Sequence, residues 1–151
     1  MEYVEHINTA DIIAAADKAL ERCLSEFFSE ISLEEAAHPE ILDDKYTEDI
    51  LLKIQAEYYM TLKSLWDHSR ISRLGSFSKY YDSPEVGQTV DMQALDKAYK
   101  DARRRTLWEK LTRTNHKDVL EYKQLLRQYS EALLSSMRDR FSIALSKLRV
   151  I

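Results

Sequence analysis

Only two glycines and two prolines occur among the 151 residues of this chain, and their scarcity limits what it can fold into. Glycine and proline supply the backbone conformations of tight turns, whereas the abundant Leu, Ala, Glu, Lys and Arg favour helices. A chain with so few places to turn is predicted to form a few long helices. We therefore expect an all-α fold, an antiparallel bundle of about four main helices in a single domain over residues 1–151.

The first half of the chain should hold two long helices. Apolar residues recur at helical steps over residues 9–31, behind Asn8 as a possible cap. Ser32 and Glu35 form a capping-box pattern, which predicts a bend and a short second helix. A long helix is then expected over residues 48–74, with Gly75 at a left-handed C-terminal cap; its core stripe is Leu51, Ile54, Tyr58, Leu62 and Leu65.

The second half should add a helix over residues 92–113, capped by Asp91, and a final helix over residues 116–149. The final helix carries two apolar stripes about 100° apart, which predicts contacts on more than one side and a central place in the bundle. Such a helix would be about 50 Å long at 1.5 Å per residue. Because that exceeds a compact domain of this size, we expect part of it to project or to pair with another chain.

Residues 75–90 should form an irregular connection, since they hold both glycines and several polar residues. Connections of this length are uncommon in compact domains and are often functional. This one also carries Phe77, Tyr80 and Tyr81, which a fully solvated loop would not need. Either these rings pack back on the bundle or they form a contact with a partner.

The charge changes sign along the chain. Residues 1–60 hold 15 acidic and four basic residues, a net charge of −11, whereas residues 61–151 hold 18 basic and 11 acidic residues, a net charge of +7. Such asymmetry bears on association and partners, not on fold. The basic half can pair with the acidic half within one chain or across an oligomer, or it can bind nucleic acid or an acidic protein, and the sequence leaves these alternatives open.

One basic stretch, residues 97–113, is the strongest candidate for contacts with nucleic acid or an acidic partner. Lysine and arginine that neutralise phosphates supply salt-sensitive affinity that does not depend on base sequence. The overall negative charge and the absence of a recognisable DNA-binding motif argue against nucleic-acid binding. The candidate contacts are Lys97, Lys100, Arg103, Arg104, Arg105, Lys110 and Arg113.

The sequence shows no signature of catalysis. It has neither a glycine-rich phosphate loop nor a nucleophile elbow. Glu35 and His38 have the Glu-x-x-His spacing of di-iron bundles, but no second pair exists. We therefore expect a protein that is not an enzyme and that holds no metal or cofactor.

The remaining interpretation is a module for protein–protein interaction or assembly, with nucleic-acid binding as the alternative. The expected partner is a protein, as a homo-oligomer or within a hetero-complex. The lone Cys23 and the absence of an apolar run near 20 residues predict a cytoplasmic or other reducing compartment and no membrane span. The candidate interface comprises Phe77, Tyr80, Tyr81, Leu134, Met137, Phe141, Leu145 and Leu148.

Overall fold

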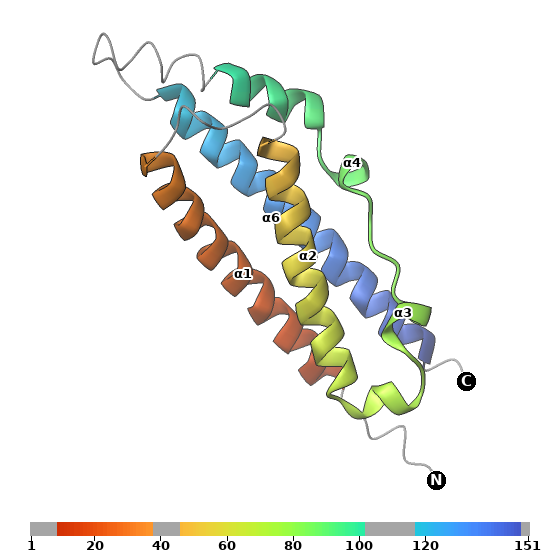
Figure 1. The fold of residues 1–151 in the computed structure, drawn as a ribbon. Helices are drawn as coiled ribbons and strands as arrows, with labels where there is room; N and C mark the ends of the chain where they lie inside the picture. The colour runs from red at the N-terminus through yellow and green to blue at the C-terminus, as the bar shows by residue number, and fades with distance from the viewer. Residues whose placement is uncertain (1–8, 38–45, 102–116, 149–151) are drawn as a thin grey trace.

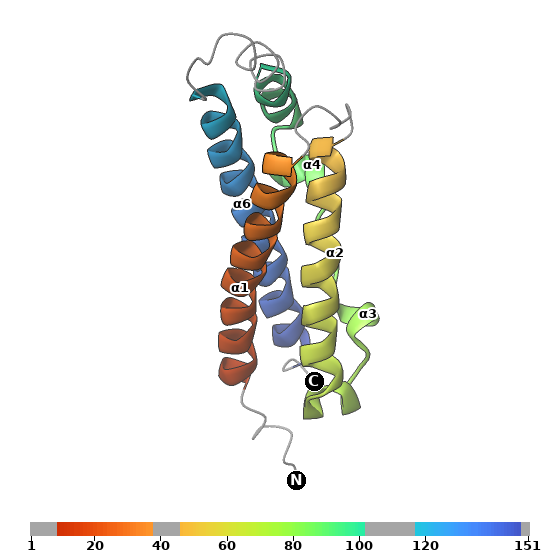
Figure 2. The same ribbon diagram turned by 60° about the vertical axis from the view of Figure 1, so that its left-hand side comes forward.

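The chain folds into a bundle of helices, as the sequence predicts (Figure 1). A computed structural model describes residues 9–37, 46–101 and 117–148. Three long helices run the length of the bundle: α1 (Thr9–Ala37), α2 (Tyr46–Asp67) and α6 (Lys117–Lys147). The fourth main helix covers residues 92–101 of the described chain. Figure 2 shows it near the end of the bundle at which α2 and α6 begin.

The directions of the three long helices follow from their contacts. Tyr122 meets Thr47 near the start of both α6 and α2, and Phe141 meets Trp66 near the end of both, so these two helices run in the same direction. Helix α1 runs antiparallel to both of them (Figure 1). Two contacts with α6 establish this, because Asp17, early in α1, pairs with Arg138, whereas Phe28, later in α1, lies under Arg127.

The chain between α2 and the helix at 92–101 travels back along the bundle (Figure 1). After α2 it forms the 3-10 helix η3 (Arg70–Arg73) and two single helical turns, α3 (Phe77–Tyr80) and α4 (Val86–Thr89). The turns α3 and α4 are joined by extended residues and pack on α6, and α3 also contacts α2. The predicted irregular connection therefore contains two helical turns. It covers the parallel pair of helices α2 and α6.

Aromatic rings hold this connection in place. Phe77 stacks on Tyr81, with ring centroids 4.7 Å apart, and packs edge-on against Trp66 of α2 at 5.8 Å. Phe141 of α6 completes the group, at 6.1 Å from Trp66 and 6.3 Å from Phe77. Phe77 and Tyr81 are buried, so they pack back on the bundle, as the first of the two alternatives proposed.

Two predicted boundaries in the first half are wrong. Helix α1 continues through Ser32 to Ala37, because Ser-Leu-Glu-Glu-Ala-Ala consists mostly of good helix formers and an unbroken helix needs no new cap. The second long helix ends at Asp67 rather than residue 74. There the Ser69 hydroxyl accepts a hydrogen bond from the Ile71 amide and starts the 3-10 helix, which turns Ile71 into the core.

Of two expectations for the second half, one is confirmed and one is wrong. Asp91 caps the helix at 92–101 as predicted, since its carboxylate accepts the Ala94 amide at 3.1 Å. Helix α6 does not project from the bundle. Its buried side chains run from Tyr122 to Leu148, because α1 beside it has 29 residues and is nearly as long as the 31 residues of α6.

Gly75 is required for a different reason from the one predicted. Its backbone is not left-handed; instead, a Cβ atom at this position would overlap the ring of Tyr80. That ring stacks on Trp66, and the Trp66 indole donates to the carbonyl of Gly75 at 2.9 Å. At the turn that follows α2, the backbone of Gly75 therefore lies close to the rings of Trp66 and Tyr80. Only glycine, which has no Cβ, leaves room for this approach.

Gly75→Ala should lower the free energy of unfolding by about 1–3 kcal/mol, because the added methyl forces the Tyr80 ring off Trp66. The matched control is Gly87→Ala, where a Cβ meets nothing within 4 Å, and it should be neutral or stabilise by up to about 1 kcal/mol. Urea denaturation of the three proteins checks this. Equal effects of the two substitutions would contradict the close approach.

Ser130 of α6 is fully buried, and its hydroxyl has no hydrogen-bond partner among the described residues. A buried hydroxyl without a partner loses its hydrogen bonds to water and gains none in the folded protein, so its burial lowers the stability of the fold. Ser130→Ala should therefore raise the free energy of unfolding by about 1 kcal/mol beyond the gain of Ser135→Ala, an exposed position on the same helix that controls for helix propensity. A smaller gain at Ser130 than at Ser135 in thermal denaturation would refute this account.

Candidate functional site

The predicted protein interface lies in the interior of the molecule, and this prediction needs correction. All but one of its eight side chains are at most 7% exposed, and Tyr80 is half-buried. Apolar stripes on helices have the same spacing whether they meet their own chain or another one. The buried members are Phe77, Tyr81, Leu134, Met137, Phe141, Leu145 and Leu148.

Only part of the predicted basic stretch belongs to the described chain. Lys97 and Lys100 are exposed on the helix at 92–101, where they line a shallow depression of about 580 Å³ together with Asp96 and Asp101. Two acidic side chains thus accompany the two basic ones, and the formal charges that line the depression sum to zero. Nucleic-acid contact by this stretch stays a prediction, since its other members lie outside the described residues: Arg103, Arg104, Arg105, Lys110 and Arg113.

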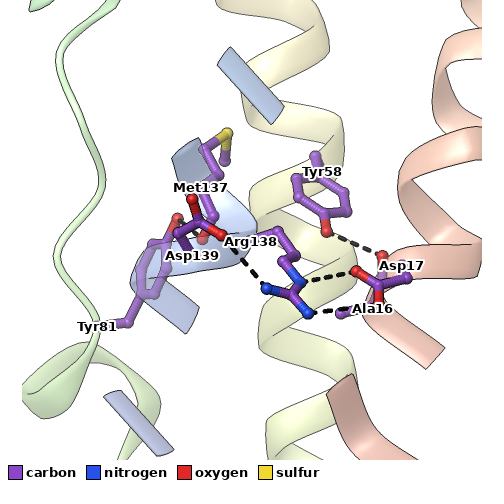
Figure 3. Close-up of polar contacts among 7 residues, drawn as sticks. All are labelled: Ala16, Asp17, Tyr58, Tyr81, Met137, Arg138 and Asp139. Atoms are coloured by element: carbon purple, nitrogen blue, oxygen red, sulfur yellow. Dashed lines mark hydrogen bonds and ion pairs between the residues drawn. The ribbon is translucent and has the colours of Figure 1, made fainter. Parts of the chain in front are cut away.

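A polar junction ties the three long helices and the connection together at one level (Figure 3). The Arg138 guanidinium of α6 donates to the carboxylate of Asp17 on α1 at 2.7 Å and 3.4 Å. This ion pair joins the acidic half of the chain to the basic half. Nearby, the Tyr58 hydroxyl of α2 donates to the carbonyl of Ala16 at 2.9 Å, and Tyr81 donates to that of Met137 at 3.3 Å. These contacts orient the helices relative to one another.

The tyrosines of this junction resist ionisation. Burial is the main cause that raises the pKa of Tyr58, and the carboxylate of Asp17 raises it further. Burial also raises the pKa of Tyr81 to about 12, although a hydrogen bond with Ser83 and the charge of Arg140 oppose the shift. Both phenols are therefore neutral at ordinary pH and serve as hydrogen-bond donors.

Two further features bear on chemistry in the described part of the chain, the thiol of Cys23 and the arrangement of possible metal ligands. Cys23 is half-buried on α1, and burial raises the pKa of its thiol, a shift that Glu57 of α2 reinforces. A raised pKa keeps the thiol protonated and therefore unreactive, which favours a structural role for Cys23. Among the side chains that the structure describes, no three of His, Cys, Asp or Glu converge to form a possible metal site. The pair Glu35 and His38 falls outside the side chains that are described.

A shallow groove of about 550 Å³ lies between α2 and the connection. Its walls are mainly apolar. Helix α2 contributes Leu52, Gln55, Ala56 and Tyr59, and the connection contributes Ser83, Pro84, Glu85 and Val86. The Gln55 side-chain amide donates to the carbonyl of Pro84 at 2.7 Å and so fixes the width of the groove. On the other side of the connection, Arg140 of α6 donates to the carbonyl of Asp82 at 3.2 Å.

One exposed apolar side chain, Leu52, lines this groove, and a second one, Met60, lies further along α2. Leu52 on its wall is 46% exposed, and Met60, one turn beyond Ala56 on the same side of α2, is 60% exposed. The third large apolar side chain that the described residues expose is Ile143, on α6. Two of the three thus lie together, over about two turns of one helix.

Sequence reasoning missed this groove, although one signal was present. Leu52 and Met60 stand outside the stripe that predicts the core face of α2, eight residues apart and therefore on one side of the helix. Apolar residues off the core stripe of a surface helix are candidates for exposure. The other wall could not be foreseen, because it depends on how residues 83–86 return along α2.

Comparison with known proteins adds no relative. Protein-family models, curated proteins and solved structures all give no match to this chain. None of the helices in the described ranges is both long enough and apolar enough to cross a bilayer.

The raised pKa of Tyr81 predicts a loss of stability at alkaline pH. Unfolded tyrosine has a pKa of 10.0, so the folded chain favours the neutral phenol. This contribution is fully present below pH 10 and is lost as the pH rises towards 12. Urea denaturation at a series of pH values should show the loss. Tyr81→Phe should reduce its size and cost at most about 1 kcal/mol at neutral pH. An unchanged alkaline loss in the variant would show that Tyr81 is not the group responsible.

Proposed function

We propose that this protein is a non-enzymatic interaction module and that the groove between α2 and residues 83–86 is where it binds a protein partner. The observation that supports this proposal most is the clustering of exposed apolar side chains. Leu52 lines a groove whose walls are mainly apolar, and Met60 is exposed about two turns further along α2. Contiguous exposed apolar surface on a protein is a common mark of an interaction site.

The construction of the groove supports the same conclusion. Both walls are anchored before any partner arrives, one by the α2 helix and the other by the hydrogen bond from Gln55 to Pro84 and the burial of Tyr81. Binding to a surface that is already ordered costs less conformational entropy than binding to a loop. The groove also holds few polar groups that could orient a reacting small molecule, because the Gln55 amide is engaged with Pro84.

The test is affinity purification of the full chain from its native cells, with nuclease treatment and mass spectrometry. The double variant Leu52→Gln/Met60→Gln should lose the specific protein partner about tenfold or more, because apolar anchors in a groove dominate binding energy. Glutamine is a good helix former and adds no charge, so the fold and the electrostatics stay as they are.

The matched control is Ile143→Gln, which removes an equally exposed apolar side chain from α6. This variant should retain the partner. If the double variant retains every protein that the wild type captures, the groove is not the interaction site. If nuclease treatment removes all partners, nucleic-acid binding replaces the proposal.

A further inference from the structure

We infer that the occupant of the groove is a basic amphipathic helix of another protein, which lies along α2 with its apolar face on Leu52 and Met60. This inference rests on the proposed function and specifies the chemistry of the partner. It follows from the charges at the edge of the groove, from the spacing of the exposed apolar residues on α2, and from the size of the apolar surface.

Acidic side chains surround the groove. Glu85 lines it directly, and Glu48 and Asp49 precede Leu52 by one turn on the same side of α2. At the other end, Lys63 is paired with Asp67. These five side chains have a net charge of −3.

Lys53, which follows Leu52 on α2, does not offset this charge. The ammonium group of Lys53 lies over the ring of Phe27, 5.8 Å from its centroid, and so faces α1 instead of the groove. Complementary charge around an apolar site selects the partner and raises its association rate. An apolar face flanked by lysine or arginine matches this surface, whereas one flanked by acids is repelled.

The spacing of the exposed apolar residues on α2 suits a partner helix. Leu52 and Met60 are eight residues apart, so the exposed apolar side chains extend over about 12 Å of α2. A partner helix that presents apolar residues at positions i, i+4 and i+7 covers the same distance with one face. An added β-strand is less suitable, because helix walls offer no free backbone edge for it to pair with.

The apolar surface is too small to favour a second copy of this chain. A stable homodimer buries about 800 Å² or more per subunit with a large apolar core. Of the large apolar side chains exposed in the described ranges, only Leu52 and Met60 belong to this face, and Ile143 lies on α6. Two anchors within two turns suit one helix better than a subunit interface.

The test is selection from an unbiased phage-displayed library of helical peptides of about four turns, with the full chain as target. Binders are removed by counter-selection on the Leu52→Gln/Met60→Gln variant. Enriched peptides should carry apolar residues at helical spacing, flanked by lysine and arginine. A labelled peptide with the enriched sequence should bind the wild type in fluorescence anisotropy, and its affinity should fall as NaCl rises from about 0.05 to 0.5 M.

Charge reversal at the edge of the groove provides the matched comparison. Glu48→Lys/Glu85→Lys should weaken binding of this peptide about tenfold, whereas Glu121→Lys/Glu131→Lys, two exposed acids on α6, should change it less than about twofold. Circular dichroism checks that each variant remains folded, because Glu48 also stabilises the first turn of α2.

The outcomes separate the two claims. Groove-dependent binders that are neutral, acidic or non-helical would overturn the inference and leave the interaction function standing. A selection that yields no binder sensitive to the Leu52→Gln/Met60→Gln change would overturn the inference, and retention of every captured protein by that variant in the affinity purification would overturn the proposed function as well. The inference also fails if light scattering shows a dimer of the wild type that this double variant dissociates, because the groove then belongs to a second copy.

Discussion

Helices α2 and α6 run in the same direction, and the rest of the structure depends on how the chain between them returns. A parallel pair cannot be joined by a short loop, so residues 68–91 must travel back along the bundle. A connection of this length is held in place where its side chains are buried. Phe77 and Tyr81 supply that burial, because they pack against Trp66 of α2 and Phe141 of α6. The same return places Pro84 and Val86 beside α2 and so creates the groove.

Much of the fold could be predicted from residue periodicity and the scarcity of glycine and proline. The capping role of Asp91 and the inward direction of Tyr58 were both readable. The ends of α1 and α2 were harder to predict. At Ser32 a capping pattern competes with strong helix formers, and the break after Asp67 depends on hydrogen bonds of Ser69. Helix direction was not readable either, since it depends on contacts between residues more than 70 positions apart, such as Thr47 and Tyr122.

The site was harder to predict than the fold, for a physical reason. A stripe such as Leu134, Met137 and Phe141 satisfies the same periodicity in a core as in an interface, and here the chain covers it with its own helices. The informative residues were those off the stripe. Leu52 and Met60 remain exposed because α1, α6 and the connection already cover the other sides of α2. The charge asymmetry is partly internal, as the pair of Asp17 and Arg138 shows, yet acids around the groove remain available to a partner.

The groove exists only if residues 77–90 lie against α2, and nuclear Overhauser contacts test this placement most directly. We predict cross-peaks between the ring protons of Tyr59 and those of Phe77 and Tyr81, whose centroids lie 5.3 Å and 5.9 Å away. A further cross-peak should join the Gln55 side-chain amide to residue Pro84. Shifts near random-coil values for residues 77–90, with no cross-peak to α2, would mean that the connection does not fold back and that the groove does not exist.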